Sequence, residues 1–161
     1  MNILIIFTIT LLLIIIYNKK RETFKSITLD VAVIVEPRKH KYLIPIIKDT
    51  LKKIPQSTKI QIFHGTHNID FIKDNLKEEI YGGRIILTNL NKENIDRHYY
   101  SDLFTSKEFW DQIDGEHILI FQTDSCLCSN SKHPIEYYLE HGYVGGPLKK
   151  SNNDDAIVYQ N

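Results

Sequence analysis

The side chains best suited to chemistry stand at the end of one apolar run. Residues 118–121 read Ile-Leu-Ile-Phe and lead directly into Gln-Thr-Asp-Ser at 122–125. Such a run predicts a buried strand, and α/β sheets bind their ligands beyond the carboxyl ends of strands. The Asp124 carboxylate could hold a divalent metal there, and the metal could hold a diphosphate. The alternative is an aspartate that only caps the following turn.

A second polar group follows an apolar run near residue 30. Residues 31–35 read Val-Ala-Val-Ile-Val, which is typical of a strand covered on both faces, and we expect this strand to extend over 27–35. Glu36 and Arg38 follow it. We expect them to leave the sheet at the same edge as Asp124. The alternative is an exposed ion pair between the two side chains, worth at most about 1 kcal/mol.

Other reactive residue types form weaker patterns. Cys126, Cys128 and His133 are close in sequence, but a zinc site needs four ligands at tetrahedral spacing and no second pair follows. We therefore expect buried or idle thiols. His64 and Asn68 follow another expected strand, where a polar loop explains them without a ligand.

The elements that must position these residues alternate along the chain. Strands are expected at 27–35, 59–63, 84–89 and 118–121, and helices at 43–54, about 71–76, 99–113 and 134–139. This order predicts an α/β sandwich with a mostly parallel sheet between helices. Helical spacing assigns Tyr99, Phe109 and Trp110 to the core.

The amino-terminal segment predicts a membrane anchor. Ile3 to Tyr17 carries no charge, and at 1.5 Å per residue it spans roughly 25 Å, a short transmembrane helix. A cleaved signal peptide fits less well, because the basic residues follow the apolar run and no small-residue cleavage site is present. We expect an anchor at 1–18, a basic linker at 19–26 and one domain at 27–161. The basic linker favours a cytosolic domain, with the lumenal side as the alternative.

Composition limits the function further. Twenty Lys and Arg balance twenty Asp and Glu, so no net charge favours binding to nucleic acid. A hydrophobic content of 42% is enough for a real core in a single domain.

Four segments together resemble a known family. They are Val-Ala-Val-Ile-Val-Glu-Pro-Arg at 31–38, Tyr-Tyr-Ser-Asp-Leu-Phe-Thr-Ser-Lys-Glu-Phe-Trp at 99–110, Ile-Leu-Ile-Phe-Gln-Thr-Asp-Ser at 118–125 and Tyr-Val-Gly-Gly-Pro at 143–147. Their order and spacing resemble an uncharacterised family of glycosyltransferase-like domains of giant viruses, bacteria and fungi. That family is similar to nucleotide-sugar-dependent glycosyltransferases of the GT-A fold, and the resemblance covers about 27–147.

The resemblance implies a GT-A, Rossmann-like fold and transfer of a sugar from a nucleotide-sugar donor to an unknown acceptor. It implies Mn²⁺ or Mg²⁺ as cofactor, with Asp124 as the metal ligand. The implied site residues are Glu36, Arg38, Gln122 and Asp124 at the nucleotide and Gly145, Gly146 and Pro147 on the acceptor side.

Two departures from the family pattern leave other functions open. Gln122 stands where the metal-binding motif has its first aspartate, and an amide oxygen supplies no charge. The pattern also continues beyond Pro147 with acceptor-binding elements, whereas this chain ends at Asn161. The first alternative is a truncated, non-catalytic nucleotide-binding module anchored in a membrane. The second is a metal-dependent phosphoester hydrolase using Asp124.

Overall fold

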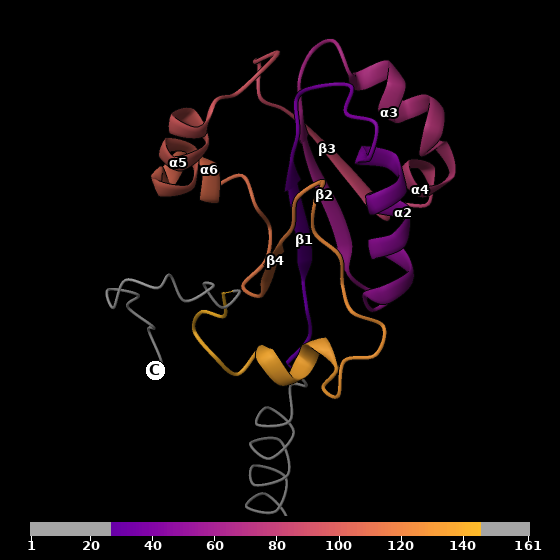
Figure 1. Ribbon diagram of the computed structural model, residues 1–161, viewed down its shortest axis with the longest axis vertical. Coiled ribbons are helices and arrows are strands. Elements are labelled where there is room, and N and C mark those ends of the chain that lie inside the picture. Colours follow the sequence, from indigo (N-terminus) through magenta and orange to yellow (C-terminus); the bar gives the residue numbers. More distant parts are fainter. Residues whose placement is uncertain (1–26, 146–161) are drawn as a thin grey trace, which may run out of the picture.

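The computed structural model describes residues 27–145, in which helices flank a four-stranded parallel sheet (Figure 1). The elements are β1 (Val31–Val35), α2 (Leu43–Lys53), β2 (Lys59–His64), α3 (Ile69–Asn75), α4 (Lys77–Tyr81), β3 (Ile85–Asn89), α5 (Arg97–Thr105), α6 (Lys107–Trp110), β4 (Ile118–Ile120) and the 3₁₀ helix η1 (Ile135–Tyr138). This confirms the prediction of a parallel sheet sandwiched by helices.

The strand order is β3-β2-β1-β4, and every pairing is parallel. Val31 lies opposite Lys59 on β2 and opposite Ile118 on β4. The chain adds β2 and then β3 on one side of β1, and returns through α5 and α6 to place β4 on the other side. The direction of winding therefore reverses between β1 and β4, and the carboxyl ends of those two strands border a crevice.

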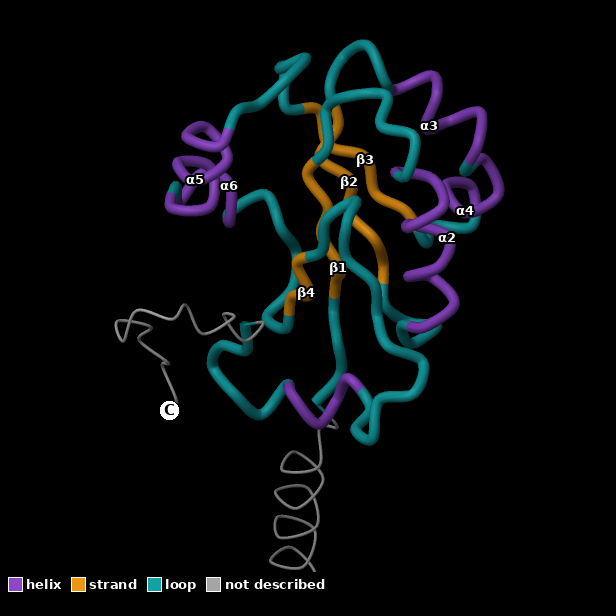
Figure 2. The backbone as a smooth tube through the Cα atoms, in the orientation of Figure 1, coloured by secondary structure: helices purple, strands orange, loops and turns teal. Residues whose placement is uncertain are grey.

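Alternate side chains of β1 supply two separate cores. Ala32 and Ile34 belong to the cluster that includes residues of α2 and α3, and Val31, Val33 and Val35 belong to the cluster that includes Phe109 of α6. Figure 2 shows the corresponding layers, with α2, α3 and α4 on one side of the sheet and α5 and α6 on the other. Burial on both faces explains why β1 is apolar throughout.

Several boundaries differ from those expected. The first strand begins at Val31, and the expected helix over 99–113 is two helices separated at Ser106. Ser106 has extended backbone angles, and its Oγ accepts a hydrogen bond from Phe109 N at 3.3 Å, so it ends α5 and caps α6. The helix expected over about 71–76 is α3, and α4, which follows it, was not expected. The helix expected over 134–139 is the short η1.

The core prediction for Trp110 was wrong. Phe109 is 1% exposed, whereas Trp110 is 38% exposed and its Nε1 donates to Phe104 O at 2.9 Å. Neighbouring residues of a helix point in different directions, so Phe109 and Trp110 cannot both face the core. A new helix begins after Ser106, and its orientation differs from that of the single helix expected over 99–113.

The prediction of a buried strand at 118–121 also needs correction. β4 has three residues, all partly exposed, and it forms one edge of the sheet among the described strands. Only Phe121, directly after it, is buried, at 5% exposed. The returning crossover explains this position, because β2 already occupies the other side of β1.

The expected anchor at 1–18 and linker at 19–26 lie outside the described residues. Within 27–145, no helix combines the length and the apolar character that crossing a bilayer requires.

Candidate functional site

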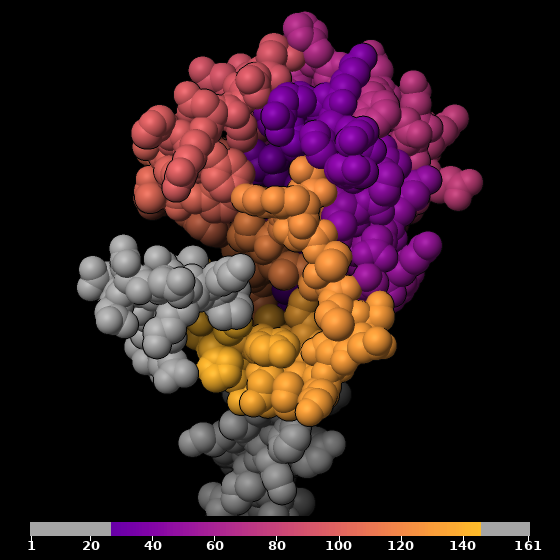
Figure 3. All heavy atoms as spheres, in the orientation of Figure 1, coloured from indigo at the N-terminus to yellow at the C-terminus, as the bar shows by residue number. Residues whose placement is uncertain are grey.

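A cleft of about 550 Å³ lies at the carboxyl ends of β1 and β4. Residues from three segments line it: Val35, Glu36, Arg38, His40 and Tyr42 after β1, Ile95, Asp96, Arg97 and Tyr100 around the start of α5, and Gln122, Thr123 and Asp124 after β4. In Figure 3 the orange segment that follows β4 lies between the salmon α5 region and the indigo loop after β1. The four residues expected at the nucleotide thus line one cleft.

Glu36 and Arg38 form a bidentate ion pair on the β1 wall. Arg38 Nε donates to Glu36 Oε1 and Arg38 Nη2 to Glu36 Oε2, each at 2.8 Å, and Arg38 N donates to Oε1 at 3.1 Å. The Glu36 side chain is 5% exposed, whereas that of Arg38 is 54% exposed. The hydrogen bond to Glu36 raises the pKa of Arg38. The buried carboxylate therefore fixes a guanidinium whose outer edge faces the cleft.

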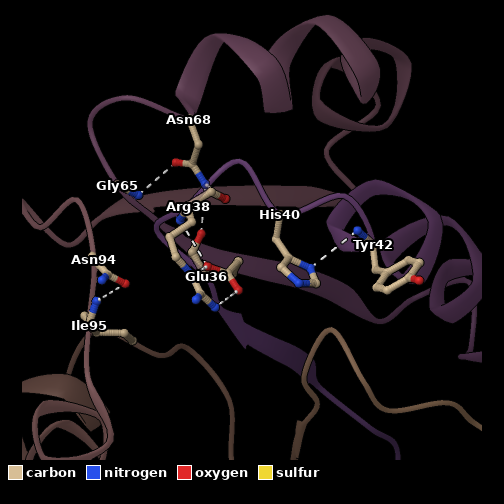
Figure 4. Close-up of polar contacts among 8 residues, drawn as sticks. All are labelled: Glu36, Arg38, His40, Tyr42, Gly65, Asn68, Asn94 and Ile95. Carbon is tan, nitrogen blue, oxygen red and sulfur yellow. Dashed lines mark hydrogen bonds and ion pairs between the residues drawn. The ribbon is translucent and has the colours of Figure 1, made fainter.

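Asn68 holds the backbone that carries this pair (Figure 4). Its Nδ2 donates to Glu36 O at 2.8 Å and to Arg38 O at 3.0 Å, and its Oδ1 accepts from Gly65 N at 2.9 Å. The residue is completely buried. One side chain thus joins the loops that follow β1 and β2.

The close approach of these loops requires glycine at position 65. A Cβ there would lie 2.5 Å from Lys92 O and 2.6 Å from Pro37 O. Both contacts are backbone atoms, which cannot rotate away as a side chain would, so the clash would displace the loop between Glu36 and Arg38.

The opposite wall is built by Tyr100 and the residues after β4. Gln122 Nε2 donates to the Tyr100 hydroxyl oxygen at 2.8 Å, and Gln122 N donates to Ser125 Oγ at 2.9 Å. Burial raises the pKa of Tyr100 and the nearby Asp124 carboxylate adds to the increase, while the bond from Gln122 opposes it. Tyr100 therefore keeps its proton at neutral pH, and that proton can be donated to a ligand in the cleft.

Sequence reasoning missed the contribution of α5 and of the loop after Arg38. Arg97, Tyr100, His40 and Tyr42 all line the cleft. A usable signal was present for the first two, because in a β-α-β crossover the helix begins at the carboxyl edge of the sheet. Side chains in the first turn of α5 are therefore near the crevice.

The side-chain oxygens of Asp124 and Gln122 in the cleft could bind a metal ion that is also coordinated by phosphates of a ligand. Asp124 offers a carboxylate, and Gln122 keeps its amide oxygen available while its nitrogen bonds Tyr100. Mg²⁺ is often held by one or two carboxylates together with substrate phosphates and water. Among residues 27–145, no group of three or more His, Cys, Asp and Glu side chains could hold a metal ion.

The remaining candidates lie apart from the cleft. Cys126 and Cys128 are free and exposed, so of the expected buried or idle thiols the buried alternative was wrong. His64 is 5% exposed and its Nδ1 lies 2.8 Å from Gly65 O, a structural contact. Gly145 is exposed and is not among the cleft-lining residues. The other two acceptor-side candidates, Gly146 and Pro147, lie outside the described residues.

Comparison with known proteins relates the carboxyl-terminal part of the chain to a family. Residues 84–161 match the family described as "Protein of unknown function (DUF5672)". The matched part includes Asp124 and begins after β1 and β2, so Glu36 and Arg38 precede it. No curated protein and no solved structure matches the chain. The family description carries no activity, so a relationship to glycosyltransferases remains a proposal.

Proposed function

We propose that the cleft between β1 and β4 binds a nucleotide diphosphosugar and that the protein transfers the sugar to an acceptor. One observation carries the proposal: Glu36 and Arg38 on one wall and Gln122 and Asp124 on the other line the same cleft. The order β3-β2-β1-β4 also equals the first part of the doubly wound nucleotide-binding order, in which ligands bind where the winding reverses.

In the proposed reaction, an acceptor hydroxyl forms a bond to the anomeric carbon and loses its proton to water. The bond between that carbon and the diphosphate oxygen breaks, and its electron pair leaves with the diphosphate. Arg38 and Arg97 supply positive charge near the departing group. A divalent metal held by Asp124 and Gln122 would supply further charge neutralisation. The Tyr100 hydroxyl donates a hydrogen bond to the ligand in the cleft. We assign no acceptor-side base.

The alternative is a nucleotide-binding module without turnover. It uses the same cleft and the same residues, and differs only in lacking transfer. In both versions we propose that Ile3 to Tyr17 anchors the protein in a membrane, with the domain on the cytosolic side.

The test measures binding of a panel of nucleotide diphosphosugars to the full chain in detergent, with and without Mn²⁺, by calorimetry. For the donor that binds, Asp124→Asn should weaken Mn²⁺-dependent binding about tenfold or more, equivalent to 1.4 kcal/mol. Arg38→Ala should weaken binding with or without metal. Asp102→Asn is the matched control, because Asp102 is exposed on α5 and does not line the cleft.

Three results are informative. Binding that depends on Arg38 and Asp124, followed by release of the free nucleoside diphosphate when an acceptor is added, supports the transferase. The same binding without release or transfer supports the module. An absence of binding for every donor overturns both.

A further inference from the structure

Aromatic side chains gather on the surface formed by η1 and the turn that follows it. His133 stacks on Tyr137 with ring centroids 4.0 Å apart, and Tyr138 meets Tyr137 edge-on at 5.3 Å. Tyr137 is 52% exposed, and farther along the chain Tyr143 is 88% exposed. Val144 is also exposed. We call the mutually packed side chains of His133, Tyr137 and Tyr138 the η1 surface.

The core holds the η1 part of this surface in place. Ile135 and Leu139 pack against the cluster that contains Leu29 and the α2 side chains. Lys53 Nζ donates to Leu127 O at 2.7 Å, which ties the segment before η1 to the end of α2. The outward tyrosines are therefore presented by a fixed element.

The η1 surface lies at the same end of the molecule as residue 27. Figure 1 shows η1 beside the start of the described chain, at the amino end of β1, and Ile135 and Leu139 pack against the cluster that contains Leu29. Ile27 itself is 42% exposed. The cleft lies at the carboxyl end of β1, so the two features occupy opposite ends of that strand.

We propose that the η1 surface rests in the headgroup region of a lipid bilayer. The inference depends on the proposed anchor at Ile3 to Tyr17. Ten positions separate Tyr17 from Ile27, and a fully extended chain covers at most about 3.5 Å per residue, so this end stays within roughly 35 Å of the anchor. The exposed tyrosines also fit this partner, because tyrosine is enriched where hydrocarbon meets water.

Charge supports a shallow contact. The linker carries Lys19, Lys20, Arg21 and Lys25, which attract anionic headgroups, whereas Glu136 and Glu140 beside the tyrosines oppose deep insertion. The tyrosine hydroxyls thus lie at headgroup depth and η1 stays outside the hydrocarbon.

The experiment uses the full chain with Cys126→Ser and Cys128→Ser, reconstituted in vesicles of phosphatidylcholine and phosphatidylserine at 4:1. A fluorescent label is placed at Lys132→Cys, which leaves both tyrosines in place, or at Thr66→Cys as the control at the opposite end. Both positions are exposed. A lipid with a spin label on its headgroup should quench the label at 132 at least about twofold more than the label at 66. Tyr137→Ser with Tyr138→Ser should remove that difference.

Carbonate extraction is measured in parallel, so that failure of the anchor is distinguished from failure of the surface contact. Equal quenching at both positions in an extraction-resistant chain overturns the proposed contact and leaves the anchor standing. Release of the chain by carbonate overturns both. Energy transfer between labels at 132 on different chains indicates that a second copy covers the surface, and it also overturns the proposal. None of these outcomes depends on nucleotide binding at the cleft.

Discussion

At the scale of single residues, Asn68 does the most to shape the β1 wall of the cleft. Its side-chain amide forms hydrogen bonds with three backbone groups, Gly65 N, Glu36 O and Arg38 O, which lie in two separate loops. The sequence placed Asn68 in a polar loop that needed no ligand, and the structure agrees that its contacts are internal. What the sequence could not reveal was the identity of its partners, because Asn68 Nδ2 bonds a carbonyl 32 positions earlier in the chain.

Asn68→Ala should lower the free energy of unfolding by about 2–4 kcal/mol, because it leaves buried backbone groups without hydrogen-bond partners. Urea denaturation followed by circular dichroism measures the change. Asn75→Ala is the matched control: Asn75 is exposed and makes one bond, to Phe71 O, so its loss should cost less than about 0.5 kcal/mol. Equal losses for the two variants would contradict the role assigned to Asn68.

Asp30 also holds backbone groups of a distant segment through its side chain, at the other end of the sheet from Asn68. Its Oδ2 accepts from Glu116 N and from His117 N, both at 2.9 Å, at the start of β4. The hydrogen bond from His117 N is the main reason that the pKa of Asp30 lies below its ordinary value of 3.8. A lowered pKa in the folded protein means that the stabilisation is complete above pH 3.8 and is lost as pH falls through the folded value.

Asp30→Asn should therefore cost about 1 kcal/mol of stability at pH 7, a modest value because the side chain is 37% exposed. The difference from the parent should shrink toward zero as pH is lowered below about 4. Denaturation curves between pH 2.5 and 7 measure it. Asp114→Asn, at an exposed position two residues before Glu116, is the control, because Glu116 N and His117 N donate to Asp30 and not to Asp114. A difference that stays constant across this range would rule out the carboxylate as its source.

At the scale of elements, the apolar patterns predicted which strands and helices exist better than they predicted where those elements end or how deeply they are buried. The runs at 31–35 and 118–120 are strands as expected, since continuous apolar runs rich in β-branched residues suit a parallel sheet. The pattern over 99–113 was ambiguous, because Ser106 can be tolerated inside a helix or can cap a new one. Its tertiary position decides: Ser106 caps α6, which directs Phe109 into the core and Trp110 to the surface.

Phe109 and Trp110 offer a matched pair for testing this arrangement. Phe109 packs on Phe63 and Phe104 with centroid distances of 4.8 and 4.7 Å, so Phe109→Ala should cost about 3–5 kcal/mol. Trp110→Ala should cost about 1 kcal/mol, because much of that side chain is already in water. Circular dichroism is the appropriate signal, since Trp110 is the only tryptophan in the sequence. A larger loss at Trp110 would show that α6 is oriented differently.

At the scale of the whole molecule, the class of fold could be predicted from the sequence and the geometry of the cleft only in part. Alternation of strands and helices predicts a parallel sheet, and polar residues after strands predict which edge is functional. The position of β4 beside β1 could not be predicted, because the sequence pattern does not show where the winding reverses. The same reversal brings Arg97 and Tyr100 to the cleft, at the carboxyl edge of the sheet where the crossover helix α5 begins.

The pairing of β4 with β1 also has a consequence for how the chain folds. The partners in the hydrogen bond from His117 N to Asp30 are 87 positions apart, whereas β1 and β2 pair across one short helix. Closing the longer loop costs more chain entropy, so we expect β4 to join a sheet already formed by β1, β2 and β3. In pulsed hydrogen exchange during refolding, amides of Ile118–Ile120 should become protected later than those of Ile60–Phe63. Simultaneous protection would contradict this order.

If β4 joins last, the cleft between β1 and β4 is completed only after the other three strands have paired. A nascent chain that has not yet emerged from the ribosome as far as residue 124 lacks the Asp124 carboxylate from the cleft lining, although Glu36 and Arg38 are already synthesised. We therefore expect the cleft to take its final shape late in synthesis.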